Sequence, residues 1–248
     1  LTGVNLGQYR QNSLDLVGLI ARLEKIEELE RIRISSIEPT TITDALIDRM
    51  ARSSKLCPYL HIPLQSGDDT ILSSMNRPYN VKEFTLLIRR ASEMIPHLGL
   101  GTDIMVGFPG ETEEAFEHTL DIAHELPFSY FHVFTYSQRP GTAAAKLPNQ
   151  VPTVVARARA KVLAELSRLK RLAFAERHVG STLSVLFESG NLDGFSAGTT
   201  ANFLKVGIPS NVDLANQLRE VRITGTSARW ALGTLTAEGQ PLRAVPML

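Results

Sequence analysis

The 248-residue sequence has little cysteine, few aromatic residues and no net charge. Its one cysteine, Cys57, excludes a disulfide framework, and it excludes any metal or iron–sulfur site built from cysteines alone within this chain. No apolar run reaches the ~18 residues of a membrane span, and no signal peptide is visible. Lys plus Arg number 26 and Asp plus Glu number 26, a balance that argues against a nucleic-acid binder when taken over the whole chain. We therefore expect a soluble cytoplasmic protein without membrane contact.

The zero total charge conceals three segments of different charge. Residues 1–150 carry 14 basic and 19 acidic side chains, whereas residues 178–248 carry five of each. Residues 151–177 carry two acidic side chains and seven basic ones, which are Arg157, Arg159, Lys161, Arg168, Lys170, Arg171 and Arg177. Local charge decides where a polyanion can dock. This basic segment could therefore bind phosphates, although a solvated helix can have the same composition.

The first 177 residues alternate between strand-like and helix-like patterns. Short β-branched or aromatic runs predict strands at 1–4, 31–35, 59–64, 98–108 and 130–136. Apolar residues at helical spacing predict helices at 13–29, 42–54, 80–95, 112–126 and 152–177. Ser13, Thr43 and Thr112 stand where helix N-caps are expected. Strand–helix units in regular order predict an α/β fold with a parallel sheet under helices, either a barrel or a doubly wound sheet.

The pattern changes after residue 178. Five short runs at 182–188, 195–200, 202–209, 218–225 and 229–235 are separated by Gly, Asn, Asp and Pro. This spacing predicts a small all-β module, an open barrel of five strands. We expect a barrel domain at 1–177, the β module at 178–236, and a poorly ordered tail at 237–248.

Polar residues and glycines follow all five predicted strands of the first domain. These segments are 3–7, 35–39, 65–67, 107–111 and 137–139. Functional residues of parallel α/β folds lie at the carboxyl ends of the strands, so we expect a site there. The GFPGET segment at 107–112 fits either a backbone that approaches a ligand closely or, more simply, a tight turn before a capped helix.

Several single residues allow both a functional and a structural interpretation. Gln65 and Ser66 follow an apolar strand without a packing reason to be polar, which favours ligand contact. His61 is better interpreted as a core histidine. Asp103, a charge within an apolar strand, needs a partner or a role. Arg77 could reach a carboxylate or a phosphate, or be solvated.

Taken together, five strings and the β module resemble the radical S-adenosylmethionine methylthiotransferases over about residues 1–235. The strings are LTGVNLGQY, RIRISSIEP, YLHIPLQSGDDTIL-x-x-MNRPY, TDIMVGFPGETEEAF and FHVFTYSQRPGTAAA. The SSIEP and YSQRPGTAA strings are most similar to the branch that acts on threonylcarbamoyladenosine in tRNA. The branches that act on isopentenyladenosine in tRNA and on a ribosomal protein carry different residues at SSIEP. The β module resembles the TRAM domain.

The resemblance implies a six-unit partial barrel, of which five units are present, followed by a small all-β TRAM barrel. It implies 2-methylthiolation of N6-threonylcarbamoyladenosine at position 37 of tRNA, with S-adenosylmethionine and two [4Fe–4S] clusters as cofactors. The family's CxxxCxxC motif is absent from this sequence. We therefore expect a fragment, the carboxyl two-thirds of such an enzyme, inactive alone. Expected partners are the tRNA anticodon stem-loop and an electron donor, and the expected state is a monomer.

The resemblance also assigns site residues, without naming a catalytic residue or a metal ligand. Asn5 would meet the methionine amino group, and Glu38 would face the same cavity. Gln65 and Ser66 would hold the ribose or carboxylate. The remaining cofactor-binding positions are Asp103 and Gly107 on the adenosine side, and Phe134 and Tyr136 along the adenine or the incoming base. The predicted RNA-binding residues are Arg168, Lys170, Arg171, Phe203 and Lys205.

Two other classes remain open. A different barrel enzyme, such as an aldolase or lyase, would need a lysine or a carboxylate cluster at the strand ends. The lysines of residues 1–150 fall on predicted helices or loops: Lys25, Lys55, Lys82 and Lys146. A non-catalytic RNA-binding protein, made of a degenerate barrel and the β module, fits the missing cluster cysteines.

Overall fold

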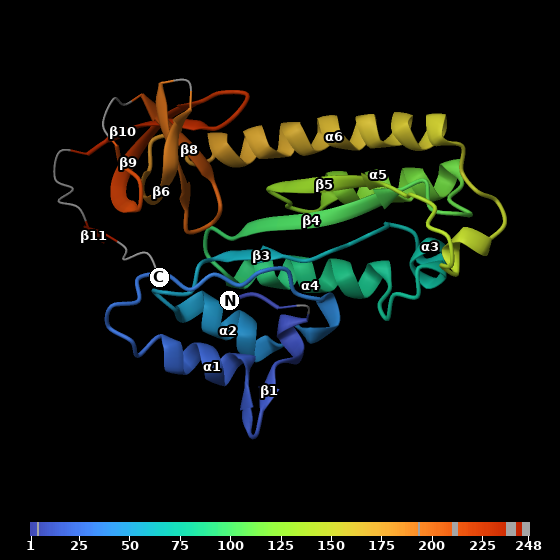
Figure 1. Cartoon of the computed structure of the whole chain (residues 1–248), viewed down its shortest axis with the longest axis horizontal. Coiled ribbons are helices and arrows are strands. Elements are labelled where there is room, and N and C mark those ends of the chain that lie inside the picture. Colours follow the sequence, from blue (N-terminus) through green and yellow to red (C-terminus); the bar gives the residue numbers. More distant parts are fainter. Residues whose placement is uncertain (4, 193, 210–212, 237–241, 245–248) are drawn as a thin grey trace. The chain divides into compact units, whose positions relative to one another are not determined.

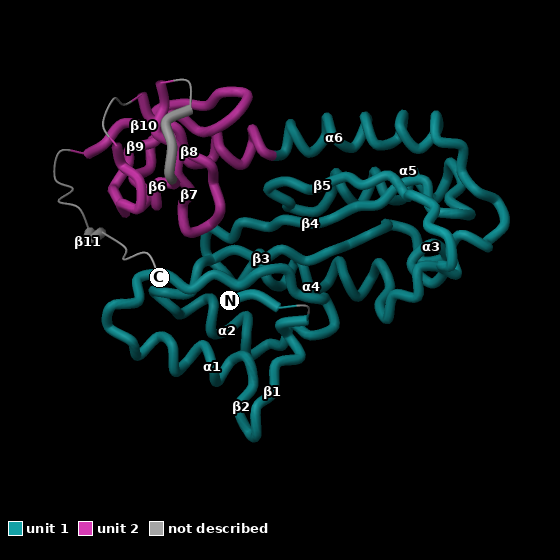
Figure 2. Tube along the Cα trace, viewed as in Figure 1, with its two compact units in different colours: residues 1–170 teal, residues 171–248 magenta. Residues whose placement is uncertain are grey.

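The computed structural model describes the chain except for residues 4, 193, 210–212, 237–241 and 245–248. Most of the tail predicted at 237–248, and Val4 of the first predicted strand, thus lie outside the described residues. The chain divides into two compact units, residues 1–170 and 171–248 (Figure 2). The division falls inside the helix α6 (Thr153–Glu176), because Phe174 and Ala175 pack into the core of the second unit.

The first unit is built on a parallel sheet of three strands. Its order is β3 (Tyr59–His61), β4 (Gly99–Val106) and β5 (Tyr130–Thr135), side by side in Figure 1. The two strands predicted at 1–4 and 31–35 form no ladder in the described residues. They are extended segments joined by single contacts, such as Ser35 N to Leu1 O at 3.0 Å and the bridge between Ile32 and Leu56. The predicted α/β fold is confirmed, as part of a barrel.

The helices of the first unit are α1 (Leu16–Leu23), α2 (Asp44–Arg52), α3 (Asp69–Ser74), α4 (Val81–Met94) and α5 (Glu113–Glu125). α2, α4 and α5 lie within two residues of their predicted ranges, whereas α1 ends six residues before the predicted end at 29 and α3 was not predicted. Short 3₁₀ turns η1 (Leu6–Gln8), η2 (Pro39–Thr41) and η3 (Ala144–Lys146) and a small hairpin, β1 (Arg10–Gln11) and β2 (Leu14–Asp15), complete the unit. Thr43 and Thr112 cap α2 and α5 as predicted, but Asp15 rather than Ser13 caps α1. No helix in the described ranges is both long and apolar enough to cross a bilayer.

The two faces of the sheet differ in chemistry. Alternate residues of β4 and β5, such as Leu100, Ile104 and Phe131, are buried in the main hydrophobic core. The residues between them line the other face, which we call the polar face: Tyr59, His61, Asp103, Met105, Tyr130, His132 and Phe134. Phe134 on this face is 49% exposed. The polar face is therefore the surface of the sheet that can meet a ligand.

The second unit is a closed β barrel. Its strands are β6 (Thr182–Leu192), β7 (Phe195–Thr200), β8 (Lys205–Pro209), β9 (Gln217–Thr226) and β10 (Ala231–Leu235), all five at the predicted places. β11 (Leu242–Ala244) adds to β9. The expected open barrel is wrong, because β10 pairs with both β8 and β9 and so closes the ring. Val185, Phe187 and Val221 fill its core.

Candidate functional site

A buried ion pair between Glu111 and Arg159 holds the loop after β4. Gly107 has φ of 77° and Gly110 has φ of 90°, a left-handed backbone that glycine adopts without strain. Glu111 Oε2 accepts hydrogen bonds from Gly107 N and from Arg159 Nη1, both at 2.7 Å. Arg159 Nη2 also donates to Glu113 Oε2 at 2.8 Å. The tight turn and capped helix interpretation of the GFPGET segment is confirmed.

Because Arg159 pairs with Glu111 in the interior, α6 presents one basic side chain fewer to solvent than the sequence count suggests. The Glu111 side chain is fully buried and that of Arg159 is 7% exposed. Burial raises the pKa of the Glu111 carboxyl, although the hydrogen bonds from Gly107 and Arg159 oppose it. Arg159, counted from sequence with the basic segment, is thus a structural anchor that joins α6 to the loop after β4.

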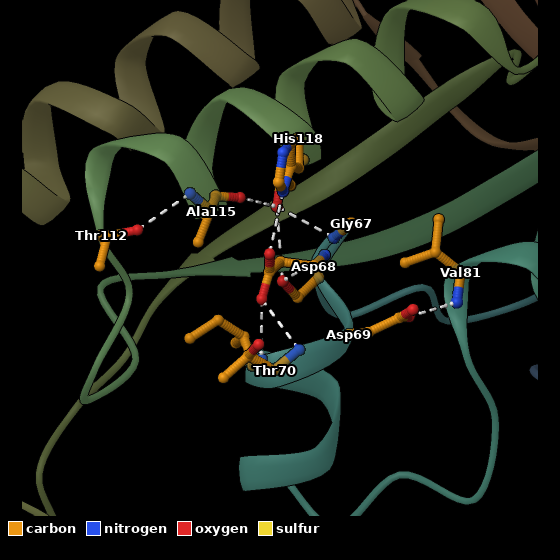
Figure 3. Close-up of polar contacts among 11 residues, drawn as sticks. Gly67, Asp68, Asp69, Thr70, Val81, Thr112, Ala115 and His118 are labelled. Carbon is orange, nitrogen blue, oxygen red and sulfur yellow. Dashed lines mark hydrogen bonds and ion pairs between the residues drawn. The ribbon is translucent and has the colours of Figure 1, made fainter.

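The loop after β3 is fastened to α5 by hydrogen bonds (Figure 3). Gly67 N donates to Thr119 Oγ1 at 2.9 Å, and a Cβ on Gly67 would lie 2.6 Å from Thr119 Cα. Asp68 caps α3 and lies 2.9 Å from His118 Nδ1. Ser66 is fully buried, and its hydroxyl accepts from Asp68 N at 3.2 Å. In this structure the Ser66 side chain supports the loop, and its contact with a ligand stays a prediction.

Gln65 and Glu38 occupy ends of strands or extended segments, as predicted. Gln65 has φ of 68°, and its backbone exchanges hydrogen bonds of 2.8 Å with Asp103 O and Met105 N. Glu38 is half-buried, and its Oε1 lies 3.9 Å from Arg77 Nη1. Arg77 thus faces a carboxylate of the protein itself.

Several buried polar atoms of the first unit have no hydrogen-bond partner, and they include atoms of residues predicted to contact the cofactor. Two of these are Asn5 Oδ1, before η1, and Tyr136 Oη, directly after β5. Tyr136 packs edge-on against Phe108 of the loop after β4, with ring centroids 5.3 Å apart. A buried polar atom without a partner is costly. A polar ligand that reaches these atoms would satisfy them.

The polar face brings together groups from three neighbouring strands. His61 Nε2 lies 3.0 Å from Asp103 Oδ1, so the Asp103 carboxylate faces an imidazole, but Oδ1 accepts no hydrogen bond from any described group. His132 packs against His61, with ring centroids 5.8 Å apart. Tyr59 Oη lies 2.5 Å from Tyr130 Oη, and burial raises the Tyr59 pKa. Sequence reasoning missed His132, although polar residues in the middle of three successive strands were a signal of a shared face.

The three predicted RNA-binding residues of α6 do not form one free basic patch. Arg168 is paired with Glu165 one turn earlier, at 2.7 Å. Lys170 Nζ donates to His124 O and Leu126 O, at 2.8 and 2.6 Å, and so holds the end of α5. Arg171 is exposed. Lys170 therefore anchors the end of α5, and its contact with RNA stays a prediction.

Phe203 and Lys205 lie together on the β barrel, as predicted. Phe203 is half-buried and has φ of 69°, in the turn before β8. Lys205 Nζ lies 5.5 Å from the centroid of the Phe203 ring and 2.9 Å from Glu188 Oε1. The pair presents a ring beside a cation on the barrel surface.

The residues present fit one of the expected cofactors and not the other. Asn5 Oδ1 and Tyr136 Oη offer unsatisfied polar atoms, and Phe134 offers an exposed ring, to a molecule with amino, hydroxyl and aromatic groups such as S-adenosylmethionine. The sequence has one cysteine, Cys57, which is buried, and burial raises the pKa of its thiol. An iron–sulfur cluster therefore finds no cysteine ligand set in this chain.

Comparison with known proteins shows what this chain resembles. Residues 6–123 match the radical SAM superfamily. The chain is 39% identical over 213 residues to the tRNA-2-methylthio-N(6)-dimethylallyladenosine synthase of Ehrlichia chaffeensis, covering 85% of this chain and 48% of the relative. It is 36% identical over 230 residues to the threonylcarbamoyladenosine tRNA methylthiotransferase MtaB of Bacillus subtilis, covering 90% of this chain and 51% of the relative. The chain spans about half the length of these curated relatives.

A solved structure supports the fold. The chain aligns with the radical SAM enzyme coproporphyrinogen III oxidase (HemN) of Escherichia coli with a TM-score of 0.51 and 17% identity. The alignment covers 83% of this chain and 51% of that structure. At this identity the likeness shows only the fold, a partial α/β barrel of the radical SAM type.

Proposed function

We propose, on the premise that this chain belongs to the radical SAM methylthiotransferase family, that its intact protein 2-methylthiolates N6-threonylcarbamoyladenosine at position 37 of tRNA. The relatives that carry methylthiotransferase names act on tRNA according to those names, which supports tRNA as the substrate. Relatives of both nucleoside specificities are similarly identical to this chain, at 39% and 36%, so identity does not separate them. The SSIEP and YSQRPGTAA strings favour the threonylcarbamoyladenosine branch.

The observation that carries the proposal is the pair of unpartnered buried atoms near the strand ends, on a chain of this family. Asn5 Oδ1 would accept from the amino group of S-adenosylmethionine, and Tyr136 Oη would meet its ribose or the incoming base. Gln65 and Glu38 would contribute polar groups beside them, and the exposed Phe134 ring would stack on a base. When bound, S-adenosylmethionine and the family's iron–sulfur clusters supply the radical and sulfur chemistry. The residues of this chain bind, orient and exclude water.

The anchored loops explain how the site keeps its shape. The Glu111–Arg159 pair fixes Gly107, and the Gly67–Thr119 hydrogen bond holds the loop that follows Gln65. Side chains held by packing and supporting hydrogen bonds position a substrate better than mobile ones do. Ser66 and Arg159 thus act through the loops they hold.

The β barrel would hold the tRNA anticodon stem-loop, in the role of a TRAM domain. Phe203 beside Lys205 supports this role, because an aromatic ring can stack on a base while a cation pairs with a phosphate. Arg171 and the exposed Arg157 and Lys161 of α6 would add phosphate contacts. An electron donor completes the partners, and a monomer is the expected state.

Nucleoside mass spectrometry of tRNA from cells that lack the intact gene tests the substrate. We expect loss of 2-methylthio-N6-threonylcarbamoyladenosine and retention of the dimethylallyl counterpart. Loss of the dimethylallyl nucleoside alone would place the protein in the other tRNA branch. If both nucleosides persist, the tRNA proposal fails, and methylthiolation of a ribosomal protein or RNA binding without catalysis replaces it.

Complementation with single variants tests the site. Asn5→Ala should abolish the modification while the variant chain folds normally, because its amide oxygen has no partner within the protein. The matched control is Gln8→Ala, an exposed amide at the end of the 3₁₀ turn that Asn5 precedes. Equal modification by both variants would refute the role of Asn5.

A further inference from the structure

Two histidines and one aspartate converge on the polar face of the three-stranded sheet. His61 lies on β3, Asp103 on β4 and His132 on β5, and in the parallel register Asp103 stands directly beside His132. One ligand atom from each residue lies within 4.8 Å of the other two. Among the described residues, no other three histidine, cysteine or acidic side chains bring their ligand atoms within 4.8 Å of one another.

The contact between His61 and Asp103 lacks the geometry of a hydrogen bond. Nε2 of His61 is 3.0 Å from Oδ1 of Asp103, yet Oδ1 is buried and accepts no hydrogen bond from any described group. A buried carboxylate oxygen without a partner is costly. Two ligand atoms about 2.1 Å from one metal ion and at a right angle lie about 3.0 Å apart. A cation between the two side chains would therefore satisfy both atoms at their observed separation.

The second nitrogen of His61 is supported as the metal-binding histidines of proteins usually are. Nδ1 faces the hydroxyl oxygens of Tyr59 and Tyr130, at 3.5 and 3.4 Å. Tyr130 also packs edge-on against His132, with ring centroids 5.2 Å apart. A donor–acceptor partner on one ring nitrogen orients the ring and leaves the other nitrogen for a metal ion. The tyrosine pair thus orients His61, and Tyr130 packs against the ring of His132.

We propose that His61, Asp103 and His132 bind one divalent first-row transition-metal ion on the polar face. Two imidazoles and one carboxylate suit Zn²⁺, Fe²⁺ or Co²⁺, whereas Mg²⁺ and Ca²⁺ take oxygen ligands. Three protein ligands leave at least one coordination position open. Because His132 is exposed, that position faces solvent and would take water or an oxygen atom of a ligand. This assigns metal ligands that the sequence interpretation did not.

Cobalt titration of the tag-free 248-residue chain, after treatment with a chelator, tests the site. We expect visible Co²⁺ absorption that saturates at one equivalent and is displaced by Zn²⁺, with elemental analysis confirming one zinc per chain. His132→Gln and Asp103→Asn should each weaken binding by more than the roughly 10–100-fold typical of an outer-shell change, and Tyr130→Phe should fall within that range.

The matched control is the pair of His118, which is exposed, and Asp68, which is half-buried. Its nitrogen and oxygen lie 2.9 Å apart, close to the 3.0 Å of the proposed site, but among the described residues no third histidine, cysteine or acidic ligand atom lies within 4.8 Å of both. His118→Gln should leave the Co²⁺ titration unchanged. His132 is exposed, so its replacement should leave the circular dichroism spectrum intact and keep the comparison valid.

Two results would overturn the proposal. If the folded chain takes up neither Co²⁺ nor Zn²⁺, His61 and Asp103 share a proton and not a metal ion. If Asp103→Asn and His118→Gln bind cobalt equally, the metal lies elsewhere. The measurement uses no tRNA, so it stands or falls separately from the proposed methylthiotransferase activity.

Discussion

Removing Arg159 should destabilise the first unit more than any surface substitution does. Arg159→Met keeps the length of the side chain but leaves the Glu111 carboxylate, whose side chain is fully buried, without its cation. Breaking one partner of a buried pair costs about 3–5 kcal/mol. Loss of the contact with Glu113, which is 71% exposed, adds little. Loss of the guanidinium over the Phe116 ring, at 5.2 Å, adds about 1 kcal/mol or less.

Urea unfolding with two probes measures this effect. Trp230 is the only tryptophan and belongs to the second unit, so its fluorescence reports that unit, whereas circular dichroism also reports the first. With a typical dependence of about 2 kcal/mol per molar urea, a loss of about 4 kcal/mol lowers the circular dichroism midpoint by about 2 M. The Trp230 midpoint should move far less.

A double variant separates the ion pair from packing. Arg159→Met with Glu111→Gln removes both charges and retains an acceptor for Gly107 N. We expect it to be more stable than Arg159→Met alone, because the stranded carboxylate is gone. A shift below about 1 kcal/mol for Arg159→Met, or a double variant no better than the single one, would refute the view that this pair holds the loop.

Three further predictions concern the same unit. Gly67→Ala should lower the free energy of unfolding in urea by about 1–3 kcal/mol, because its Cβ would lie 2.6 Å from the backbone of α5. Gly225→Ala, whose Cβ would enter open space, should lower it less. Equal losses for the two variants would contradict the close approach at Gly67. Cys57 should react with iodoacetamide only as fast as the chain unfolds, since burial raises its thiol pKa; rapid labelling of the native chain would refute this. Burial alone would raise the pKa of Asp68, but the hydrogen bonds from His118 and from the first turn of α3 lower it, and Asp68 raises the pKa of His118. The pair's stabilisation should therefore be complete between about pH 4 and 6.5, and be lost as pH falls through the Asp68 pKa or rises through the His118 pKa; a His118→Gln stability difference independent of pH would contradict it.

Much of the fold followed from local patterns. The apolar spacing placed α5 and α6 within about two residues, and Thr43 and Thr112 marked helix starts that the structure confirms. Hydrophobic period and capping chemistry act within a few residues, so one sequence carries them. Asp103 is an intermediate case, because its need for a partner was clear from the sequence while the partner's identity was not.

The sequence by itself determined the α/β class, most of the helices, the β module and the polar loops after the strands. Only the tertiary structure decided which charges and polar groups meet. Arg159 turned inward to Glu111, Ser66 and Lys170 became anchors, and β10 closed the barrel. His61, Asp103 and His132 lie 29 to 71 residues apart and share one face because parallel strands align them. Such contacts depend on strand register and helix packing, which no local pattern encodes.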